Sequence, residues 1–414
     1  MDDEAPEVIL FIVDAGGGHR ASANALVAAA EEQRRPWRFR VVNVQDLLAP
    51  LDLWRRITGQ PVEATYNEWI RSDHTRFLVP MLRLMQWLIR RMRRQLRGLV
   101  VRELRARPPA LALSLMPNFN AVLRDAVREA LPGKSLFVLL TDYADFPPHF
   151  WMEPGLDRVI VGSDHAAEQA RALGLAPEAI ARTSGMVMHP RFYAGGGPAA
   201  GTAARAELGI PADAFAVMEL FGGKGSAEMR PLTEALLAAL PDAHVIAICG
   251  DNPPLVDSMA PLAEASGGRL HVLGFTKRIA DYLSASDLLV TKPGPGSLAE
   301  AFQQRVPVVV ASHARTIPQE RWNAEMVGEL GLGCVAPSVE EMAAAAAALK
   351  ADAAAWARVQ ENLRALPPNR AVYEVLDLVE AELRRVRALG ERGEGRRSQR
   401  QQQREGRSQQ ERTI

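Results

Sequence analysis

The chain has 414 residues, of which 48% are hydrophobic and 24% charged, and only two are cysteines. These values are ordinary for globular proteins, so they exclude a wholly disordered chain and a small fold held together by disulfides. At roughly 100–200 residues per domain, the length predicts two or three domains. Basic and acidic side chains number 49 each, which argues against a protein built mainly to bind nucleic acid.

The first residues are acidic and lack the basic and apolar regions of a secretory signal. No stretch of about 18 uncharged apolar residues occurs in the sequence, so we do not expect a transmembrane helix. The sequence therefore predicts a protein that stays in the cytoplasm.

Short apolar runs alternate with helical patterns along the first 190 residues. The runs that predict buried strands are Val8–Val13, Arg40–Val44, Leu111–Ser114, Leu136–Thr141 and Val159–Gly162. Helices are expected between several of them, over Ala21–Gln33, Phe119–Leu131 and Ala166–Leu173. This alternation predicts a parallel sheet that is covered on both faces.

A segment rich in glycine and proline, centred on Gly195–Pro198, interrupts the pattern, which then resumes. The later strands are expected at Phe215–Leu220, His244–Cys249, Leu270–Leu273, Leu288–Thr291 and Val306–Ala311. The later helices are expected at Glu228–Leu240, Pro254–Ala265, Ser297–Gln304 and Glu320–Leu330. The sequence thus predicts an α/β protein with two doubly wound, Rossmann-like domains that face each other across a cleft.

The predicted boundaries follow from these breaks in the pattern. We expect one domain over residues 1–190, a linker over 191–205 and a second domain over 206–366. A terminal helix is expected over 367–389, where it could pack back on the first domain. Residues 390–414 are rich in Arg, Gln, Gly, Glu and Ser, so they cannot bury enough apolar surface to become ordered.

A glycine-rich turn, Gly16–Gly18, follows the first predicted strand and precedes His19. Its spacing is neither that of a dinucleotide fold nor that of an ATPase phosphate loop. His19 lies where a strand ends and a helix begins, so its imidazole is a candidate general base. A helix-capping role is the alternative. Asp14 is a candidate orienting partner for His19, or simply a turn residue.

Two further turns could bind an anion at a helix N-terminus. Gly222 and Gly223 follow the first strand of the second block, where an ordinary strand–helix loop is the alternative. Gly294 and Gly296 belong to a Gly-Pro-Gly turn, and Ser297 after it is a natural N-cap. Together, Gly294, Gly296 and Ser297 would bind a diphosphate at the start of this helix.

Polar side chains continue along these loops. Glu300 is three residues after Ser297, so it fits a capping box, although its carboxylate could instead bind ribose hydroxyls. Gln319 and Asn323 would share one helix face, next to Glu320. Such a group suits a polyhydroxylated ligand, and a polar helix start is the alternative.

Residues 76–107 contain ten arginines and a single acid, Glu103. Apolar side chains recur there at helical spacing, which predicts a basic amphipathic helix suited to an anionic membrane surface. An ordinary helix with a solvated basic face is the alternative. The candidate surface consists of Arg83, Trp87, Arg90, Arg91, Arg93, Arg94 and Arg97.

These motifs together resemble the family of monogalactosyldiacylglycerol synthases and processive diacylglycerol glucosyltransferases. The residues that carry the resemblance are Gly16–Ala23, Thr141-Asp142, Gly222-Gly223, Gly274-Phe275, Thr291–Ala301, Gln319-Glu320 and Asn323. It covers about residues 8 to 380. The family has the GT-B fold, in which an N-terminal acceptor domain and a C-terminal nucleotide-sugar domain meet. After Thr141-Asp142 the family commonly has a His-Pro pair, whereas this chain has Pro147-Pro148-His149, so His149 has no assigned role.

The resemblance implies an inverting transfer of a hexose from a UDP-sugar, bound as a co-substrate, to a lipid acceptor such as diacylglycerol. His19 would be the base, and Phe275 would border the uracil. The other implied UDP-sugar contacts are Gly222, Gly223, Gly294, Gly296, Ser297, Glu300, Gln319, Glu320 and Asn323. No tightly bound cofactor or protein metal ligands are implied, although a divalent ion could accompany UDP.

The same resemblance implies a peripheral protein on the inner face of the cell membrane, with a UDP-hexose, a lipid and an anionic surface as partners. Three alternatives stay open. They are a lipid II-type UDP-GlcNAc transferase, a UDP-sugar epimerase, and a non-catalytic protein that binds nucleotide sugars.

Overall fold

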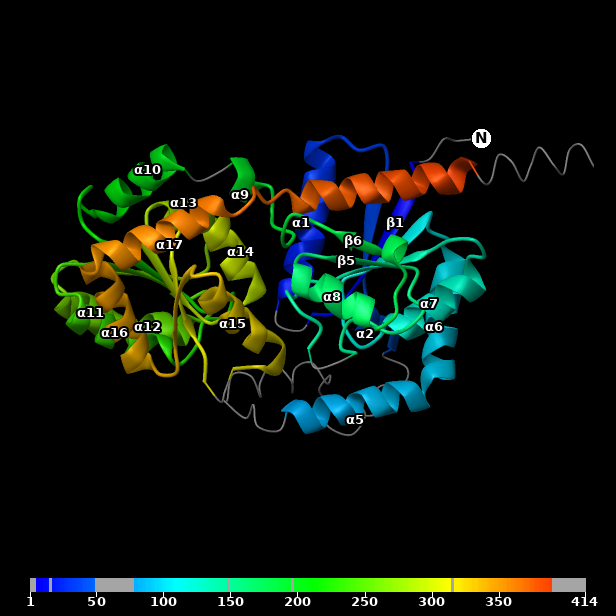
Figure 1. Ribbon diagram of the computed structural model, residues 1–414, viewed down its shortest axis with the longest axis horizontal. Coiled ribbons are helices and arrows are strands. Elements are labelled where there is room, and N and C mark those ends of the chain that lie inside the picture. The colour runs from blue at the N-terminus through cyan, green and yellow to red at the C-terminus, as the bar shows by residue number, and fades with distance from the viewer. Residues whose placement is uncertain are drawn as a thin grey trace, which may run out of the picture.

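The computed structural model describes residues 5–14, 17–48, 78–146, 149–194, 197–313 and 316–388, and these contain two six-stranded sheets. All strand pairs are parallel. The two sheets lie in separate halves of the molecule (Figure 1). The expected tail over 390–414, and part of the glycine-rich turn before His19, lie outside the described residues.

The N-terminal sheet has the strand order β2-β1-β3-β4-β5-β6. Its strands are β1 (Glu7–Ile12), β2 (Arg38–Asn43), β3 (Leu111–Ser114), β4 (Leu136–Leu139), β5 (Arg158–Val161) and β6 (Ile180–Arg182). The helices around it are α1 (Gly18–Glu32), α2 (Val44–Leu48), α5 (Leu78–Arg91), α6 (Arg93–Ala106), α7 (Asn120–Ala130) and α8 (Asp164–Ala172), with a short 3-10 turn over Pro177–Ala179.

The C-terminal sheet has the order β12-β11-β10-β7-β8-β9. Its strands are β7 (Ala216–Leu220), β8 (His244–Ile248), β9 (Leu270–Leu273), β10 (Leu288–Thr291), β11 (Val308–Ala311) and β12 (Gly333–Ala336). The helices of this half are α10 (Pro198–Leu208), α11 (Met229–Ala239), α12 (Pro253–Ala265), α13 (Ile279–Ser284), α14 (Pro295–Gln303), α15 (Arg321–Glu329), α16 (Val339–Ala351) and α17 (Ala353–Ala365), with a 3-10 turn, η4, over Pro318–Glu320.

The central strands are apolar because helices cover both of their faces. In β1 all six residues are buried, and alternate side chains enter two different core clusters. Ile9 packs with α6 and α7 on one face, whereas Val8 and Leu10 pack with α1 on the other. Thus the loops that follow the strands are held by a rigid, fully packed sheet.

The chain crosses between the halves more than once. After β6, α9 (Arg191–Ala194) leads into the C-terminal half. After α17 a helix over residues 371–388 returns and lies along the N-terminal half, where Val372 and Val375 share a core cluster with Val8 (Figure 1). Part of the expected linker, 191–205, is helical, since α9 lies in it and α10 begins in it, and Gly201 of α10 packs against the backbone of Ser284.

The predicted fold class is confirmed as two Rossmann-like units, each built on a parallel sheet. Two edge strands, β6 and β12, were not predicted. The helix expected in the arginine-rich segment is divided at Met92 into α5 and α6. In the part of the chain that the structure describes, no helix has both the length and the apolar character needed to cross a bilayer.

Candidate active site

His19 lies in the first turn of α1, directly after the loop that follows β1. Gly17 precedes the helix with φ of 82°, a left-handed conformation that favours glycine. The Nδ1 atom of His19 is 3.0 Å from Oγ1 of Thr141, which follows β4. Burial lowers the pKa of His19 to about 4, although the Leu115 carbonyl and the Asp14 carboxylate act in the opposite direction. The imidazole is therefore neutral at physiological pH.

Asp14 does not orient His19 by direct contact. Its carboxylate accepts hydrogen bonds from Arg20 at 2.5 Å and from Asn43 at 3.2 Å. The side chain that meets the His19 ring is Thr141 instead. Sequence reasoning assigned no role to Thr141, although it quoted the Thr141-Asp142 pair as part of the family pattern.

Asp142, the next residue, is a second side chain that sequence reasoning left without a role. It is 7% exposed, and its Oδ2 accepts a hydrogen bond of 2.8 Å from Nε1 of Trp151. The ring of Trp151 lies 5.6 Å from that of His19, measured between centroids. Thr141 and Asp142 therefore border His19 from two sides, one directly and one through Trp151.

Burial raises the pKa of Asp142 to about 7, and the hydrogen bond from Trp151 opposes this shift. Asp145, in the same loop, accepts hydrogen bonds from the backbone amides of Trp151 and Met152 at 2.6 and 3.3 Å. Asp145 thus fixes the loop that carries Trp151. His149 lies within this loop with φ of 63°, and its side chain is exposed.

In the C-terminal half, the Gly-Pro-Gly turn connects β10 to α14. The helix begins at Pro295 with Gly294 as its N-cap, and no side chain caps it. The expectation that Ser297 is the N-cap is therefore wrong. Proline at the first helical position is favourable because it has no N–H to leave unpaired, and its fixed φ suits the helix. Ser297 lies within the first turn, among amides that have no partner inside the helix.

Since the helix starts earlier, Glu300 is not at the capping-box position. Its side chain is largely enclosed, and burial raises its pKa to about 8, while Arg191 from the segment after β6 opposes the shift. A carboxyl group without a capping role is free to bind hydroxyl groups of a ligand.

Lys292, Glu320 and two of the predicted glycines form one compact group. The Lys292 Nζ atom is 2.9 and 3.3 Å from the two carboxylate oxygens of Glu320. A Cβ added to Gly294 would lie 3.6 Å from Cε of Lys292, and one added to Gly222 would lie 3.7 Å from the same atom. The structure thus brings the two predicted glycine turns together around Lys292, which sequence reasoning missed.

The other predicted ligand contacts differ in accessibility. Asn323 is fully buried and donates a hydrogen bond of 2.8 Å to the Pro293 carbonyl, so it stabilises the Gly-Pro-Gly turn from within the protein. Gln319 is 8% exposed, in the turn η4. Phe275, after β9, is 68% exposed and available to a planar ligand.

The two groups of side chains meet between the halves of the molecule. The Glu320 carboxylate raises the pKa of Asp142 and the Lys292 ammonium lowers it, so both charges lie within reach of that N-terminal carboxyl group. In addition, the rings of His165 in α8 and Trp322 in α15 stack with centroids 4.3 Å apart and planes 15° apart. The loops after β1 and β4 therefore face the loops after β10 and β11.

The charges around this junction come from single side chains rather than a metal-ligand cluster. Within the ranges that the structure describes, no three His, Cys, Asp or Glu side chains gather as a potential metal site. Lys292 contributes a positive charge beside the Gly-Pro-Gly turn. It would attract a phosphate placed there.

The side chains of the arginine-rich helices α5 and α6 fall into two groups, one exposed and one paired with acids of α7. On α5, Leu84, Trp87 and Leu88 are 57, 55 and 43% exposed, which is unusual for large apolar residues. Exposed arginines lie on the same helix or just after it, and the described residues record no ion pair for them: Arg83, Arg90, Arg91 and Arg94.

Arg93 and Arg97 do not belong to this exposed surface. Arg93 is 2.7 Å from a carboxylate oxygen of Asp125, and Arg97 is 3.0 Å from one of Glu129. Both acids are in α7, so these arginines join α6 to α7. We therefore remove Arg93 and Arg97 from the predicted membrane surface.

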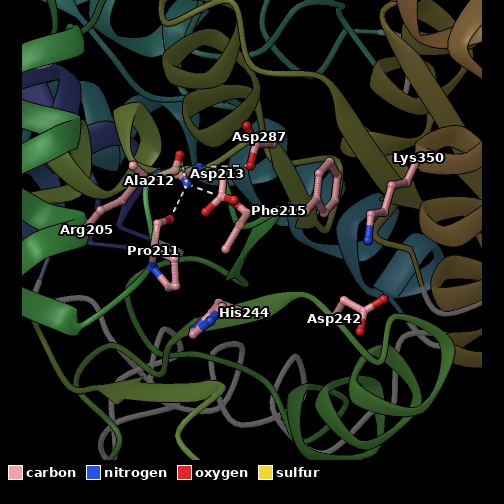
Figure 2. A pocket seen from close by; sticks show the side chains of 10 residues that line it. Arg205, Pro211, Ala212, Asp213, Phe215, Asp242, His244, Asp287 and Lys350 are labelled. Carbon is pink, nitrogen blue, oxygen red and sulfur yellow. Dashed lines mark hydrogen bonds and ion pairs between the residues drawn. The ribbon is translucent and has the colours of Figure 1, made fainter.

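A hollow of about 590 Å³ lies elsewhere, at the amino ends of the C-terminal strands. Arg205, Phe215, Asp287 and His244 are among the residues that line it (Figure 2). Arg205 donates hydrogen bonds to Asp287 at 2.9 Å and to the Ala214 carbonyl at 2.7 Å, so its guanidinium group is paired within the protein. In parallel α/β sheets ligands bind at the carboxyl ends instead, where His19 and Lys292 lie.

No family model matches this chain. It is 28% identical over 366 residues to the chloroplastic monogalactosyldiacylglycerol synthase of Spinacia oleracea, a match that covers 83% of this chain and 66% of that protein. It is 27% identical over 227 residues to the processive diacylglycerol beta-glucosyltransferase of Bacillus subtilis, which covers 54% of this chain and 57% of that protein. The chain thus spans about two thirds or less of the length of these two relatives.

Among solved structures, the Anabaena protein HepE in complex with UDP and glucose matches with a TM-score of 0.53 and 16% identity, over 91% of this chain and 99% of that chain. At this identity the likeness shows the fold alone. The chain has the GT-B fold, and the resemblance predicted from its motifs is confirmed by the sequence relatives.

Proposed function

We propose that this chain, a homologue of monogalactosyldiacylglycerol synthases and processive diacylglycerol glucosyltransferases, transfers a hexose from a UDP-sugar to the hydroxyl group of a lipid such as diacylglycerol, with inversion at the anomeric carbon. The observation that carries the proposal is the meeting of two loops. Thr141 contacts the candidate base His19, and its neighbour Asp142 lies within electrostatic reach of Lys292 and Glu320 beside the Gly-Pro-Gly turn.

His19 would act as the general base. A proton on Nδ1 can be donated to the Thr141 hydroxyl, which leaves the Nε2 lone pair for the acceptor hydroxyl. As the acceptor oxygen bonds to the anomeric carbon, its proton passes to Nε2 and is later released to water. A neutral imidazole is required at the start, and the low pKa of His19 ensures it. The negative charge of a bound UDP-sugar would raise that pKa and strengthen the base.

The bond between the anomeric carbon and the diphosphate oxygen breaks in the same step, and its electron pair leaves with UDP. The amides at the start of α14, with Gly294, Gly296 and Ser297, would hold the diphosphate as preorganised donors. Lys292 would add a positive charge, and Gly222 and Gly223 would line the other side. Attack opposite to the leaving group inverts the anomeric configuration.

The remaining contacts follow the two ends of the donor. Phe275 would border the uracil, and Glu300 would bind the ribose hydroxyls. Gln319 and Glu320 would contact the hexose. Asn323 would act indirectly, because it is buried beneath Pro293. A UDP-sugar is the co-substrate in this scheme, and a divalent ion could accompany its diphosphate.

The direct test is a panel of UDP-hexoses incubated with extracted lipids, with mass spectrometry of the products. A glycolipid product supports the proposal, whereas an epimerised free nucleotide sugar, or no product, refutes it. His19→Ala should abolish turnover and leave the affinity for UDP within about twofold. His244→Ala is the matched control and should leave turnover unchanged, since His244 lies at the amino end of β8, away from the carboxyl ends of the strands where the candidate site lies.

We also propose that α5 docks the protein on an anionic membrane surface, as a peripheral protein at the inner face of the membrane. Support comes from Leu84, Trp87 and Leu88, which expose apolar surface on a helix flanked by arginines. Each arginine near anionic lipid contributes about 1 kcal/mol. Four arginines, Arg83, Arg90, Arg91 and Arg94, therefore predict a strong dependence on salt.

Flotation with vesicles that contain phosphatidylglycerol tests this surface. Replacing Arg83, Arg90, Arg91 and Arg94 by glutamine should release the protein from the vesicles. A control with the same change in charge replaces Arg102, Arg171, Arg358 and Arg364, which lie outside α5. Equal binding of both variants would exclude α5 as the docking surface.

For the domain division, we propose a first domain over residues 1–190, a short linker, and a C-terminal nucleotide-sugar domain that ends near 366. The bond from the Gly197 amide to the Ser284 hydroxyl, 2.8 Å long, supports starting the second domain near 197 rather than 206. The helix over 371–388 would belong with the first domain, which carries the acceptor and membrane sides.

A further inference from the structure

Asp142 occupies a position that the reaction proposed above does not use. It follows Thr141, which contacts His19, and it lies within reach of the charges on Glu320 and Lys292 in the other half of the molecule. A side chain that borders both the base and the donor loop also borders the space between them. In the proposed reaction that space holds the hexose, because the anomeric carbon must reach the acceptor oxygen near His19 while its leaving group rests at α14.

The carboxyl group of Asp142 has one oxygen committed within the protein. Oδ2 accepts the hydrogen bond from Trp151, and within the described residues no hydrogen bond is recorded for Oδ1. Trp151 itself is held by Asp145, whose oxygens bind the amides of residues 151 and 152. Asp142 is therefore a rigid side chain with spare hydrogen-bonding capacity, which is what recognition of a particular hydroxyl group requires.

A ring stack also joins the two halves close to Glu320. The stack of His165 on Trp322 holds the start of α15 against α8. Glu320 lies two residues before Trp322, so this contact also restrains the turn that carries Glu320. Glu320 is paired with Lys292, whereas Asp142 pairs with no cation in the described residues.

We propose that Asp142 is a hexose contact supplied by the N-terminal domain, which binds a sugar hydroxyl from the side opposite Glu320 and determines selectivity among UDP-hexoses. This inference rests on the proposed transferase function. It adds that donor selectivity is a property of both domains and depends on their being closed upon each other. The nucleotide and the diphosphate, in contrast, are bound by the C-terminal domain alone.

The test is isothermal titration calorimetry of UDP, UDP-glucose and UDP-galactose against the wild type and Asp142→Asn, which keeps an oxygen for Trp151. Loss of one hydrogen bond to a carboxyl group predicts about a tenfold weaker affinity for the preferred UDP-hexose, with UDP unchanged within about twofold. The affinity for UDP also reports that the variant is folded. Asp142→Ala should give the same split.

Analogues of the preferred donor that lack one hydroxyl identify the group involved. The wild type should bind one deoxy analogue about tenfold more weakly than the parent donor. Asp142→Asn should bind that analogue and the parent donor equally well. Asp287→Asn is the matched control, because Asp287 also accepts a hydrogen bond from a backbone amide, that of Ala216, but lies at the amino ends of the C-terminal strands. It should lower stability and leave the ratio of UDP-hexose to UDP affinity unchanged.

Two results would overturn the inference. If the wild type binds UDP-hexoses and Asp142→Asn keeps the same ratio of affinities, Asp142 does not contact the sugar, while the proposed function stands. If the wild type binds neither UDP nor a UDP-hexose, the proposed function and this inference fail together.

Discussion

Replacing Glu219 by glutamine should remove this residue's own share of the pH dependence of stability between pH 5 and pH 8, and leave the share of Glu300, whose pKa burial also raises to about 8. Glu219 is in the middle of β7 and has no exposed surface. Its Oε2 atom is 2.6 Å from the Thr233 hydroxyl, which in turn is 2.9 Å from the Met229 carbonyl. Its Oε1 atom is buried, and no described residue forms a hydrogen bond with it. A proton on Oε2 satisfies this chain of hydrogen bonds, whereas a carboxylate would leave a buried charge unpaired.

Burial raises the pKa of Glu219 from the ordinary 4.5 to about 8, and the hydrogen bond with Thr233 offsets only part of that rise. Above pH 4.5 the unfolded chain therefore releases this proton, while the folded chain keeps it. The stabilising contribution is complete below pH 4.5 and is lost as pH rises to about 8. Since one pH unit corresponds to about 1.4 kcal/mol, the free energy of unfolding should fall by about 3.5 kcal/mol between pH 5 and pH 8.

The assay is chemical denaturation of the wild type and Glu219→Gln at intervals of pH from 5 to 8, followed by circular dichroism. The other buried carboxyl groups are the same in both proteins, so the difference between the two curves isolates Glu219. Glu234→Gln is a control on the neighbouring helix α11, where the side chain is 48% exposed and paired with Arg230. The plot of unfolding free energy against pH for Glu234→Gln should be parallel to that of the wild type.

Two curves that stay parallel from pH 5 to pH 8 would refute the reasoning. They would mean that Glu219 is ionised, or protonated, equally in the folded and unfolded chains. A second measurement is independent of unfolding. The infrared band of a protonated carboxyl group should be present at pH 6 in the wild type and weaker by one group in Glu219→Gln.

Three further changes test other parts of the structure. Thr141→Val keeps the shape of the side chain but removes the hydroxyl at His19, so kcat should fall about tenfold while the affinity for UDP stays constant; an unchanged kcat would show that the contact does not matter. Trp322→Leu removes the stack on His165, worth about 1 kcal/mol, and should increase the radius of gyration measured by small-angle scattering; identical scattering would contradict a closing role. Gly333→Ala would place a Cβ 1.8 Å from the Val308 carbonyl oxygen, so thermal denaturation should show a loss of about 3 kcal/mol. A melting temperature equal to that of the wild type would count against this crowding.

Much of the fold could be predicted because the strands are buried on both faces and read as continuous apolar runs. The strands β6 and β12 were missed because they lack such a continuous buried apolar run. β6 has only three residues, none fully buried, and β12 begins with three residues that are at least partly exposed. Edge strands of this kind carry too little apolar pattern to be separated from loops.

The site was predictable where glycine marks a turn and less so where a contact joins distant segments. Ser297 was assigned as the N-cap because serine favours that position, but the N-cap is Gly294, three residues earlier, and Pro295 starts the helix. The partners of Arg93 lie in α7, about 30 residues away, and local sequence does not show such ion pairs. Lys292 became visible only when Gly222 and Glu320 were placed beside it.

The helix over residues 371–388 has a consequence for the order in which the protein folds during synthesis. Its Val372, Val375, Leu376 and Val379 complete the core cluster that contains Val8 and Leu10 of the first strand. The N-terminal sheet therefore emerges from the ribosome first, with α1 on this face, but part of the face stays uncovered until the entire C-terminal domain has been made. We expect the C-terminal domain to reach its native state before the N-terminal one does, the reverse of the usual order in multidomain chains.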